Sequence, residues 1–400
     1  MAAGEWPFPD DLAAKVLEAR RAIHANPELS HEERETAALV RHELEAAGIG
    51  DIASVFTTGL VATIHGRRPR MGRDGGRTLA LRADMDALPI QERRPLPFAS
   101  RNAGVMHACG HDAHTAILLG VSLALHRARD QFEGTVRCIF QPAEEAEPLG
   151  AREVLKAGHL EGVEGILALH VDPDLPAGTV GVHAGALLAG GQEFTVRVRG
   201  RAAHGARPHQ GIDAIVAAAA VVQQLQTIPS RRIDPLDPVV VTVGRIEGGT
   251  ARNIIAEEVR LDGTFRVLDE GLRGEVERLI REVAEGAARA HGAEAVLETK
   301  RGEPVLVNDR GMTDLVRRAA ADVLGTDKVV EVERPSMGSE DFAYYVERVP
   351  GAMFRLGVRN EALGFAAPIH HPEFGIDERS LPVGAAVMLE SARRFLDRRD

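Results

Sequence analysis

A ten-residue stretch, HACGHDAHTA over residues 107–116, gathers side chains that can bind metals or act as nucleophiles. It holds three histidines, an aspartate and one of the two cysteines of the chain. Cys109 and His111 are two residues apart, so both can face one point if they lie on a turn that enters a helix. His114 shares the helix face of His111. The stretch is compatible with a metal site, with a Cys–His nucleophile, and with a polar helix start.

Adjacent carboxylates follow a predicted strand in FQPAEEAE (140–147), where Glu144 and Glu145 lie side by side. Two negative charges at the end of a buried strand are costly unless a positive group meets them. In a metal site they can divide the work, because one carboxylate binds the cation while its neighbour handles the proton of a bound water. A solvated acidic loop is the alternative for this pair.

Two further segments supply histidines. LHVDP (169–173) ends an apolar strand with His170, and IHHPEF (369–374) places His370 and His371 before a proline. Each histidine alone is more typical of a structural residue. Together the four segments provide ligands for two cations that share a bridging ligand, with one carboxylate to spare. Thiolate and imidazole favour zinc, cobalt, nickel or manganese over magnesium or calcium.

The composition limits the classes of protein that the chain can belong to. Its 400 residues predict two domains, since one core rarely supports that length. The net charge of −11 argues against binding to nucleic acid, which needs a basic face. No apolar run approaches the roughly 20 residues of a membrane helix. The first residues lack a signal-peptide pattern and two cysteines cannot form a disulfide framework, so we expect a cytoplasmic protein.

The first part of the chain alternates strands with helices. We expect strands over 60–66, 78–84, 135–141 and 165–171, and helices up to His24, over 32–47 and over 111–128. This alternation predicts an α/β domain with a mixed sheet flanked by helices, and ligands bind beyond the carboxyl ends of such strands. The glycine- and arginine-rich residues 71–77 are expected to form a hairpin loop.

The pattern changes between residues 186 and 299. There the order strand, helix, strand, strand, helix, strand predicts a ferredoxin-like βαββαβ unit. Alternation then resumes, with a strand over 352–358. We therefore expect a discontinuous catalytic domain, 1–185 and 300–400, interrupted by an inserted domain over 186–299.

Nine segments together carry a resemblance to a known family. In order along the chain they are RRAIHANPELSHEE (20–33), LRADMDALP (81–89), MHACGHDAHTAILLG (106–120), FQPAEE (140–145), ALHVDP (168–173), AAHGARPHQGIDAI (202–215), GGTARNIIAE (248–257), MGSEDFAYY (337–345) and HHPEFGIDE (370–378). The chain resembles the dinuclear-metal amidohydrolases of the aminoacylase/carboxypeptidase superfamily. Within it, the hippurate hydrolases, N-acyl-amino-acid amidohydrolases and auxin-conjugate hydrolases are most similar.

The resemblance implies metal-dependent hydrolysis of the amide bond of N-acyl amino acids or short peptide-like conjugates. It implies two divalent metal ions in each subunit, zinc first, with manganese, cobalt and nickel as alternatives. The implied metal ligands are Cys109 as the bridge, His111, Glu145, His170 and His371. Glu144 would be the general base and acid. Supporting roles around the ligands, such as orienting the ligating imidazoles, are implied for Asp84, Asp86, His107, Asp112 and His114.

For the inserted domain, the resemblance implies a lid that also forms a homodimer or higher homo-oligomer. His204 would polarise the scissile carbonyl, commonly from the partner subunit. Asn253 would help to hold the substrate carboxylate. From its own chemistry, Arg266 is a second candidate for that contact, since a guanidinium binds carboxylates bidentately. Considered without the resemblance, these three could equally be a turn residue, part of a glycine turn and a solvated strand arginine.

Four other functions remain possible on the sequence. They are carboxypeptidase or dipeptidase activity at the same site, a non-catalytic amino-acid or peptide binder, a thiol hydrolase that uses Cys109, and a di-zinc aminopeptidase that needs a free substrate amine.

Overall fold

The structure is a computed structural model that describes residues 8–68 and 76–397, and these form two compact units. The first unit contains the described residues up to Gly185, Val307–Glu333, and the described residues from Tyr344 onward. The second unit contains Ala186–Leu306 and Arg334–Ala343. Compared with the expected inserted domain, 186–299, the second unit continues to Leu306 and adds a later segment from the C-terminal part.

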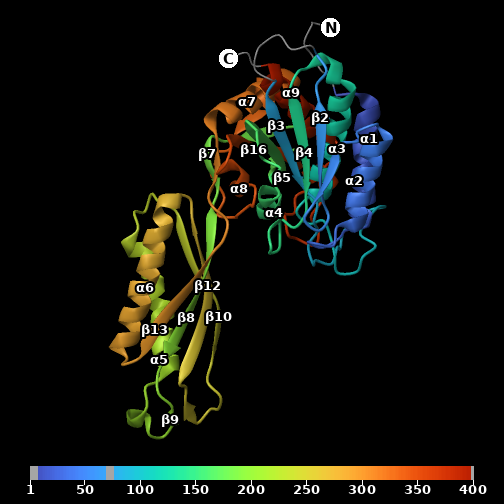
Figure 1. The fold of residues 1–400 in the computed structure, drawn as a ribbon. Coiled ribbons are helices and arrows are strands. Elements are labelled where there is room, and N and C mark those ends of the chain that lie inside the picture. Colours follow the sequence, from blue (N-terminus) through green and yellow to red (C-terminus); the bar gives the residue numbers. More distant parts are fainter. Residues whose placement is uncertain (1–7, 69–75, 398–400) are drawn as a thin grey trace. The chain divides into compact units, whose positions relative to one another are not determined.

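A mixed sheet forms the centre of the first unit, as the sequence predicted (Figure 1). Among the described residues it has eight strands in the order β1-β2-β4-β3-β5-β16-β6-β15. Strands β4, β3, β5 and β16 run parallel to one another. On one side β2 is antiparallel to β4 and β1 is antiparallel to β2, and on the other side β6 is antiparallel to β16 and β15 is parallel to β6. The strands are β1 (Ile52–Val55), β2 (Gly59–His65), β3 (Thr78–Asp84), β4 (Thr135–Gln141), β5 (Gly165–Pro176), β6 (Val180–Val182), β15 (Val329–Glu331) and β16 (Gly351–Arg359).

The predicted hairpin over 71–77 is not supported by the strand order. Residues 71–75 lie outside the described residues. The strands on either side, β2 and β3, are both paired with β4, which lies between them. The two strands are therefore not the arms of a hairpin, because the apolar run of β4 inserts between them.

Several helices accompany this sheet, and α2, α3, α4, α7 and α9 contact its strands. The helices outside the second unit's own fold are α1 (Asp10–Ala25), α2 (Arg34–Ala46), α3 (His111–Arg127), α4 (Gly150–Lys156), α7 (Arg310–Leu324), α8 (Ala343–Val346) and α9 (Ser380–Asp397). Helix α3 contacts strands β2 to β5 as well as α1 and α9, and it is buried from His111 to Leu125. A helix buried on all sides is normally apolar all round. The polar residues of its first turn must therefore have partners inside the protein.

Gly110 sets the start of α3. Its φ of +87° lies in the left-handed region, and a Cβ atom there would lie 2.4 Å from Cγ2 of Val171. Only glycine fits such a position without strain. The turn places Cys109 and His111 on either side of it, at the point where the helix begins.

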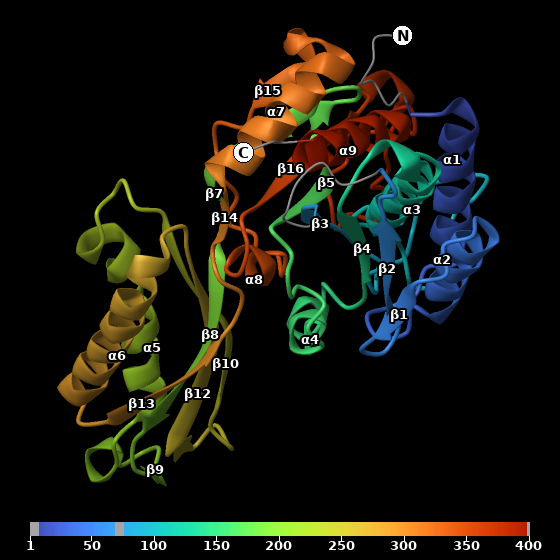
Figure 2. The same ribbon diagram turned by 45° about the horizontal axis from the view of Figure 1, so that its top comes forward.

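The second unit has the βαββαβ order expected from the sequence. Its elements are β8 (Gly190–Arg199), α5 (Ala214–Leu225), β10 (Val239–Gly248), β12 (Glu258–Val267), α6 (Arg273–Ala290) and β13 (Glu294–Arg301). The sheet is antiparallel in the order β10-β12-β8-β13. Helices α5 and α6 lie side by side on one face of it (Figure 2). Their apolar sides enclose a separate core that includes Val196, Leu261 and Phe265.

Short strands complete the chain. Strands β9 (Ala203–His204) and β11 (Ile254–Ile255) form a two-stranded sheet, and β7 (Gly185–Leu188) and β14 (Leu306–Asn308) occur where the chain passes from one unit to the other. None of the helices in the described ranges combines the length and the hydropathy that a membrane span requires.

Candidate metal centre

The centre is built where parallel strands of the first unit end. Strand β3 ends at Asp84, which is in register with Gln141 at the end of β4. Strand β5, parallel to β3, carries His170. Helix α3 begins beside them at His111, whose ring lies 6.2 Å from that of His170. The site thus occupies the carboxyl ends of the strands, as expected for this kind of sheet.

A thiol and two imidazoles form the first donor group. The ligand atoms of Cys109, His111 and His170 all lie within 4.8 Å of one another. The sulfur of Cys109 is 3.5 Å from Nε2 of His170. Nδ1 of His170 donates to the carbonyl of Val171 at 2.8 Å, which leaves the Nε2 lone pair pointing toward the sulfur.

Cys109 also belongs to a second donor group with Glu145 and His370, whose ligand atoms again lie within 4.8 Å. Nε2 of His370 is 3.2 Å from Oε1 of Glu145. Cys109 is the member that the two groups share. A third group, His111, Glu144 and Glu145, brings the second carboxylate to the same place. The predicted residues Cys109, His111, Glu145 and His170, with Glu144, are therefore brought together.

The predicted ligand His371 is not brought to this cluster. It is exposed, and its Nδ1 accepts a hydrogen bond from the backbone N–H of Glu373 at 3.2 Å. Its neighbour His370 adopts a φ of +60°, and its backbone N–H donates to the carbonyl of Ala108 at 2.8 Å. This left-handed turn directs the side chain of His370, and not that of His371, toward Cys109. Adjacent histidines in a sequence do not reveal such a turn.

His114 lies behind the donor groups with Asp84. Its Nδ1 donates to Oδ1 of Asp84 at 2.6 Å, and its Nε2 accepts from the backbone N–H of Val171 at 2.9 Å. Both ring nitrogens are thus engaged, and neither remains for a cation. Arg82 donates to the other oxygen of Asp84 at 2.6 Å. Although burial opposes it, the positive charges of His111 and Arg82 and the hydrogen bond from His114 hold the pKa of Asp84 well below its usual value.

Asp86 connects three segments of the site. Its Oδ1 accepts from Nδ1 of His111 at 3.1 Å, and its Oδ2 accepts from the backbone N–H of Glu145 at 2.9 Å. The hydroxyl of Ser30 donates to the same Oδ2 at 2.7 Å. Asp86 therefore fixes the ring of one donor and the backbone of another, as the carboxylates around metal ligands commonly do.

Asp112 belongs to a buried ionic cluster that sequence reasoning missed. Its Oδ2 accepts from Nε of Arg20 and from Nδ1 of His24, each at 2.8 Å. Burial works against its charge, but Arg20 and His24 hold the pKa of Asp112 far below its usual value. His107 lies beside this cluster, with its ring 6.4 Å from that of His24, and burial lowers its pKa to about 3. The RRAIH motif could have indicated this cluster only once α1 was known to pack on α3.

In the second unit, His204 and Asn253 are neighbours. Strands β9 and β11 pair there, and the backbone N–H of Gly205 donates to the carbonyl of Asn253 at 2.8 Å. Both side chains are exposed. Nδ1 of His204 accepts from the backbone N–H of Ala206 at 3.0 Å, so in the neutral ring Nε2 carries the proton and is a donor.

Arg266 is partly engaged within the same unit. Its Nη1 donates to the carbonyl of Met337 at 3.1 Å and to Oγ of Ser339 at 3.2 Å. These bonds hold the guanidinium against the segment that contains Ser339.

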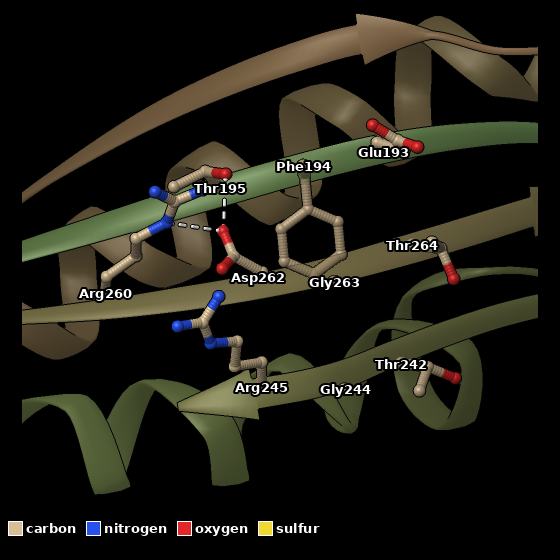
Figure 3. Close-up of a pocket in the computed structure, with 10 residues that line it drawn as sticks. All are labelled: Glu193, Phe194, Thr195, Thr242, Gly244, Arg245, Arg260, Asp262, Gly263 and Thr264. Atoms are coloured by element: carbon tan, nitrogen blue, oxygen red, sulfur yellow. Dashed lines mark hydrogen bonds and ion pairs between the residues drawn. The ribbon is translucent and has the colours of Figure 1, made fainter. Parts of the chain in front are cut away.

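A hollow of about 370 Å³ lies on the sheet of the second unit (Figure 3). The residues that line it are Glu193, Phe194, Thr195, Thr242, Gly244, Arg245, Arg260, Asp262, Gly263 and Thr264. None is a cysteine or histidine. Asp262 accepts from Nε of Arg260 at 2.7 Å and from the hydroxyl of Thr195 at 2.8 Å, so its charge is met within the sheet. This hollow therefore does not resemble the donor groups of the first unit.

Comparison with known proteins gives the family. The pattern of peptidase family M20/M25/M40 matches residues 80–394. The chain belongs to this family. It is 40% identical over 387 residues to the N-acetyl-L-cysteine deacetylase of Bacillus subtilis, covering 96% of this chain and 89% of that protein. It is 40% identical over 391 residues to the IAA-amino acid hydrolase ILR1-like 4 of Arabidopsis thaliana, covering 97% and 87%.

A solved structure agrees with the fold. The chain superposes on the Bacillus subtilis YXEP protein, described as a dinuclear metal binding peptidase from the M20 family, with a TM-score of 0.85 and 38% identity, covering 97% of this chain and 99% of that one. As a member of this M20 family, the chain is a metal-dependent amidohydrolase. The family, fold class and enzyme class predicted from the sequence are confirmed.

The donors of this M20 chain fit a pair of divalent cations. Nε2 of His111 and Oε1 of Glu145 are buried and make no hydrogen bond within the described residues. Nε2 of His370 lies 3.2 Å from this Oε1, at ion-pair distance. Leaving such atoms unpartnered is costly. Cations on either side of the Cys109 sulfur would satisfy them.

Proton occupancy at the centre is consistent with cation binding. Burial raises the pKa of the Cys109 thiol to about 12. Burial opposes the charge on His111, but the surrounding negative groups, led by Asp84, raise its pKa well above its usual value. Both groups thus hold protons that a divalent cation would displace.

Proposed function

We propose that this enzyme hydrolyses the amide bond of N-acyl amino acids or short peptide-like conjugates, releasing a carboxylic acid and an amino acid. The observation that carries the proposal is the pair of donor groups that share Cys109, with Glu144 beside them. When bound, the two cations supply Lewis acidity and lower the pKa of water at the site. Zinc is the first choice, and manganese, cobalt and nickel have suitable chemistry.

The two cations would divide the ligands according to the donor groups. Cys109, His111 and His170 would hold one ion, and Cys109, Glu145 and His370 would hold the other. We therefore propose His370 in place of His371. Asp84, Asp86 and His114 would keep the ligating rings in position through the hydrogen bonds described above.

Glu144 would carry the proton. Its carboxylate lies within 4.8 Å of the ligand atoms of His111 and Glu145, so it is at the centre and not in a remote loop. As general base it would take a proton from the attacking water, and as general acid it would return that proton to the leaving amine.

The second unit would contribute as the lid. The Nε2–H of His204 is a donor that can bind the carbonyl oxygen as negative charge develops on it. The neighbouring Asn253 would hold the carboxylate of the amino-acid portion. Arg266 would be a second carboxylate contact, with its Nη1 already positioned by Met337 and Ser339. We further propose that this unit forms a homodimer and that His204 serves the site of the partner subunit.

The test is a panel of substrates and metals. The purified chain is loaded with zinc, manganese, cobalt or nickel and assayed against N-acyl amino acids and against dipeptides with free or blocked amines. We expect hydrolysis of N-acyl amino acids. A strict requirement for a free amine would indicate an aminopeptidase, and hydrolysis of dipeptides alone would indicate the carboxypeptidase or dipeptidase alternative. Absence of turnover with every metal would favour a non-catalytic binder.

The thiol-hydrolase alternative is tested with two inhibitors. A chelator should abolish activity, while a thiol alkylator applied to the metal-loaded enzyme should leave it largely intact, because the sulfur of Cys109 would be occupied by cations. The opposite pattern would assign the nucleophile to Cys109.

A further inference from the structure

The PELSHEE segment, residues 27–33, has no role in the function proposed above, yet it is bonded to the site at two points. The hydroxyl of Ser30 donates to Oδ2 of Asp86 at 2.7 Å. Oε1 of Glu33 accepts the backbone N–H of Ala143 at 2.8 Å. Ala143 directly precedes Glu144 and Glu145.

Glu33 is fully buried and joins two loops. Its second oxygen, Oε2, accepts from the hydroxyl of Thr58 at 2.5 Å, in the turn between β1 and β2. A buried carboxylate needs such donors. Both oxygens are thus used, one on each loop, so the position of Glu33 is fixed with respect to the backbone of Ala143.

Backbone strain is concentrated at the same place. Among the described residues, the non-glycine residues in the left-handed region are His31, Phe56, Ala143 and His370. Ala143 has a φ of +51°, in a conformation that L-residues adopt only when their surroundings hold them. His31 and Phe56 lie two residues before Glu33 and Thr58 respectively, and their rings meet edge to face at 5.5 Å. The two segments that supply the donor and acceptor are therefore also packed against each other.

We propose that Glu33 is a positioning residue, whose carboxylate holds the left-handed turn at Ala143 and so presents Glu144 and Glu145 to the metal centre. This inference rests on the function proposed above. Ser30 helps to position the same residues, because its hydroxyl binds Asp86 and Asp86 accepts the backbone N–H of Glu145. Glu33 itself contacts neither substrate nor cation.

The test compares Glu33→Ala, Glu33→Gln and a matched control, Glu28→Ala. Glu28 lies in the same segment, but its side chain accepts the backbone N–H groups of Glu35 and Thr36 at the start of α2. The full chain is measured for kcat and KM, for cobalt affinity by absorbance titration, and for thermal unfolding. Cobalt affinity does not depend on turnover, so it tests Glu33 even if the proposed substrates are not hydrolysed.

For Glu33→Ala we expect kcat and cobalt affinity each to fall about tenfold or more, with little change in KM, as for other outer partners of metal ligands. Glu33→Gln should regain most of the lost kcat, because its amide oxygen can still accept the N–H of Ala143. Glu28→Ala should lower the unfolding temperature while leaving kcat and cobalt affinity unchanged. Wild-type kcat and affinity in Glu33→Ala, or equal losses in Glu28→Ala, would overturn the proposal.

A second-site variant tests whether Glu33 acts through the turn. Glycine adopts the left-handed conformation without strain, so Glu33→Ala combined with Ala143→Gly should recover part of the lost kcat. No recovery would show that Glu33 does not act through the conformation of residue 143.

If Glu33→Ala does not fold, Thr58→Val is the variant to measure. It releases one oxygen of the Glu33 carboxylate and should lower kcat at constant KM. An unchanged kcat would contradict the proposal.

Discussion

Nε2 of His170 lies 3.5 Å from the sulfur of Cys109, and the same sulfur is within 4.8 Å of ligand atoms of Glu145 and His370. One buried thiol therefore faces two sets of donors that have no other member in common. This relationship argues for a bridging ligand and against a free nucleophile, because a sulfur shared by two cations is not available to attack a carbonyl.

The first prediction concerns Cys109. Replacing it by serine should lower the metal content at both positions and reduce turnover, since the bridge serves both ions. Cys138→Ser is the matched control, because Cys138 is also buried but lies within strand β4. Metal content measured by plasma emission should stay at two ions per chain in the control. Unchanged metal content in Cys109→Ser would remove Cys109 from the ligand set.

Adjacent histidines provide the second prediction. His370→Ala should lose an ion and most of the activity, while His371→Ala should keep both, because only His370 reaches Glu145 and Cys109. Metal stoichiometry and kcat are measured for the two variants in parallel. The reverse order of effects would restore the ligand first expected from the sequence.

Glu144 is tested by the isosteric change Glu144→Gln. Loss of a general base typically costs about 10²- to 10⁴-fold in rate, and we expect a loss in that range with both metals retained. Glu147→Gln, in the same segment but exposed, should have wild-type turnover. Wild-type-like turnover in Glu144→Gln would contradict its assignment as the base.

Metal uptake should release protons. The pKa of Cys109 is raised to about 12 by burial, and that of His111 is raised well above its usual value despite burial. At neutral pH both groups are protonated, so a cation must displace those protons and its apparent affinity should rise with increasing pH. Titration calorimetry with cobalt in buffers of different ionisation enthalpy measures the release. An affinity independent of pH, without proton release, would contradict this assignment.

Subunit complementation tests the role of His204. Inactive Glu144→Gln and His204→Ala chains are mixed, dissociated and reassociated. If His204 serves the partner's site, each mixed dimer contains one site with both residues intact, and activity should return to a fraction of the wild-type value. If His204 acts within its own chain, no intact site forms and the mixture stays inactive.

Much of the fold followed from periodicity. The strands ending at Asp84 and Gln141 and the helix beginning at His111 were placed correctly, because apolar runs and glycine turns mark them in the sequence. The hairpin expected between β2 and β3 was wrong, because strand order depends on contacts between distant segments. The addition of Arg334–Ala343 to the second unit has the same origin.

Some residues of the site could be predicted from the local sequence, and others only from the three-dimensional structure. Spacing within one turn indicated Cys109 and His111, and the strand ends in the sequence indicated Glu144, Glu145 and His170. The resemblance then supplied the role of each residue. The choice between His370 and His371 depends on a left-handed backbone at one residue, which no side-chain pattern encodes. The ionic partners of Asp112, Arg20 and His24, come from another helix and are visible only in three dimensions.

The most direct test of a dinuclear centre bridged by Cys109 is anomalous X-ray diffraction from crystals of the chain grown with zinc. We predict two anomalous peaks that share the sulfur of Cys109 as a ligand, one also bound by His111 and His170 and the other by Glu145 and His370. A single peak, or two peaks without Cys109 between them, would contradict this account of the site.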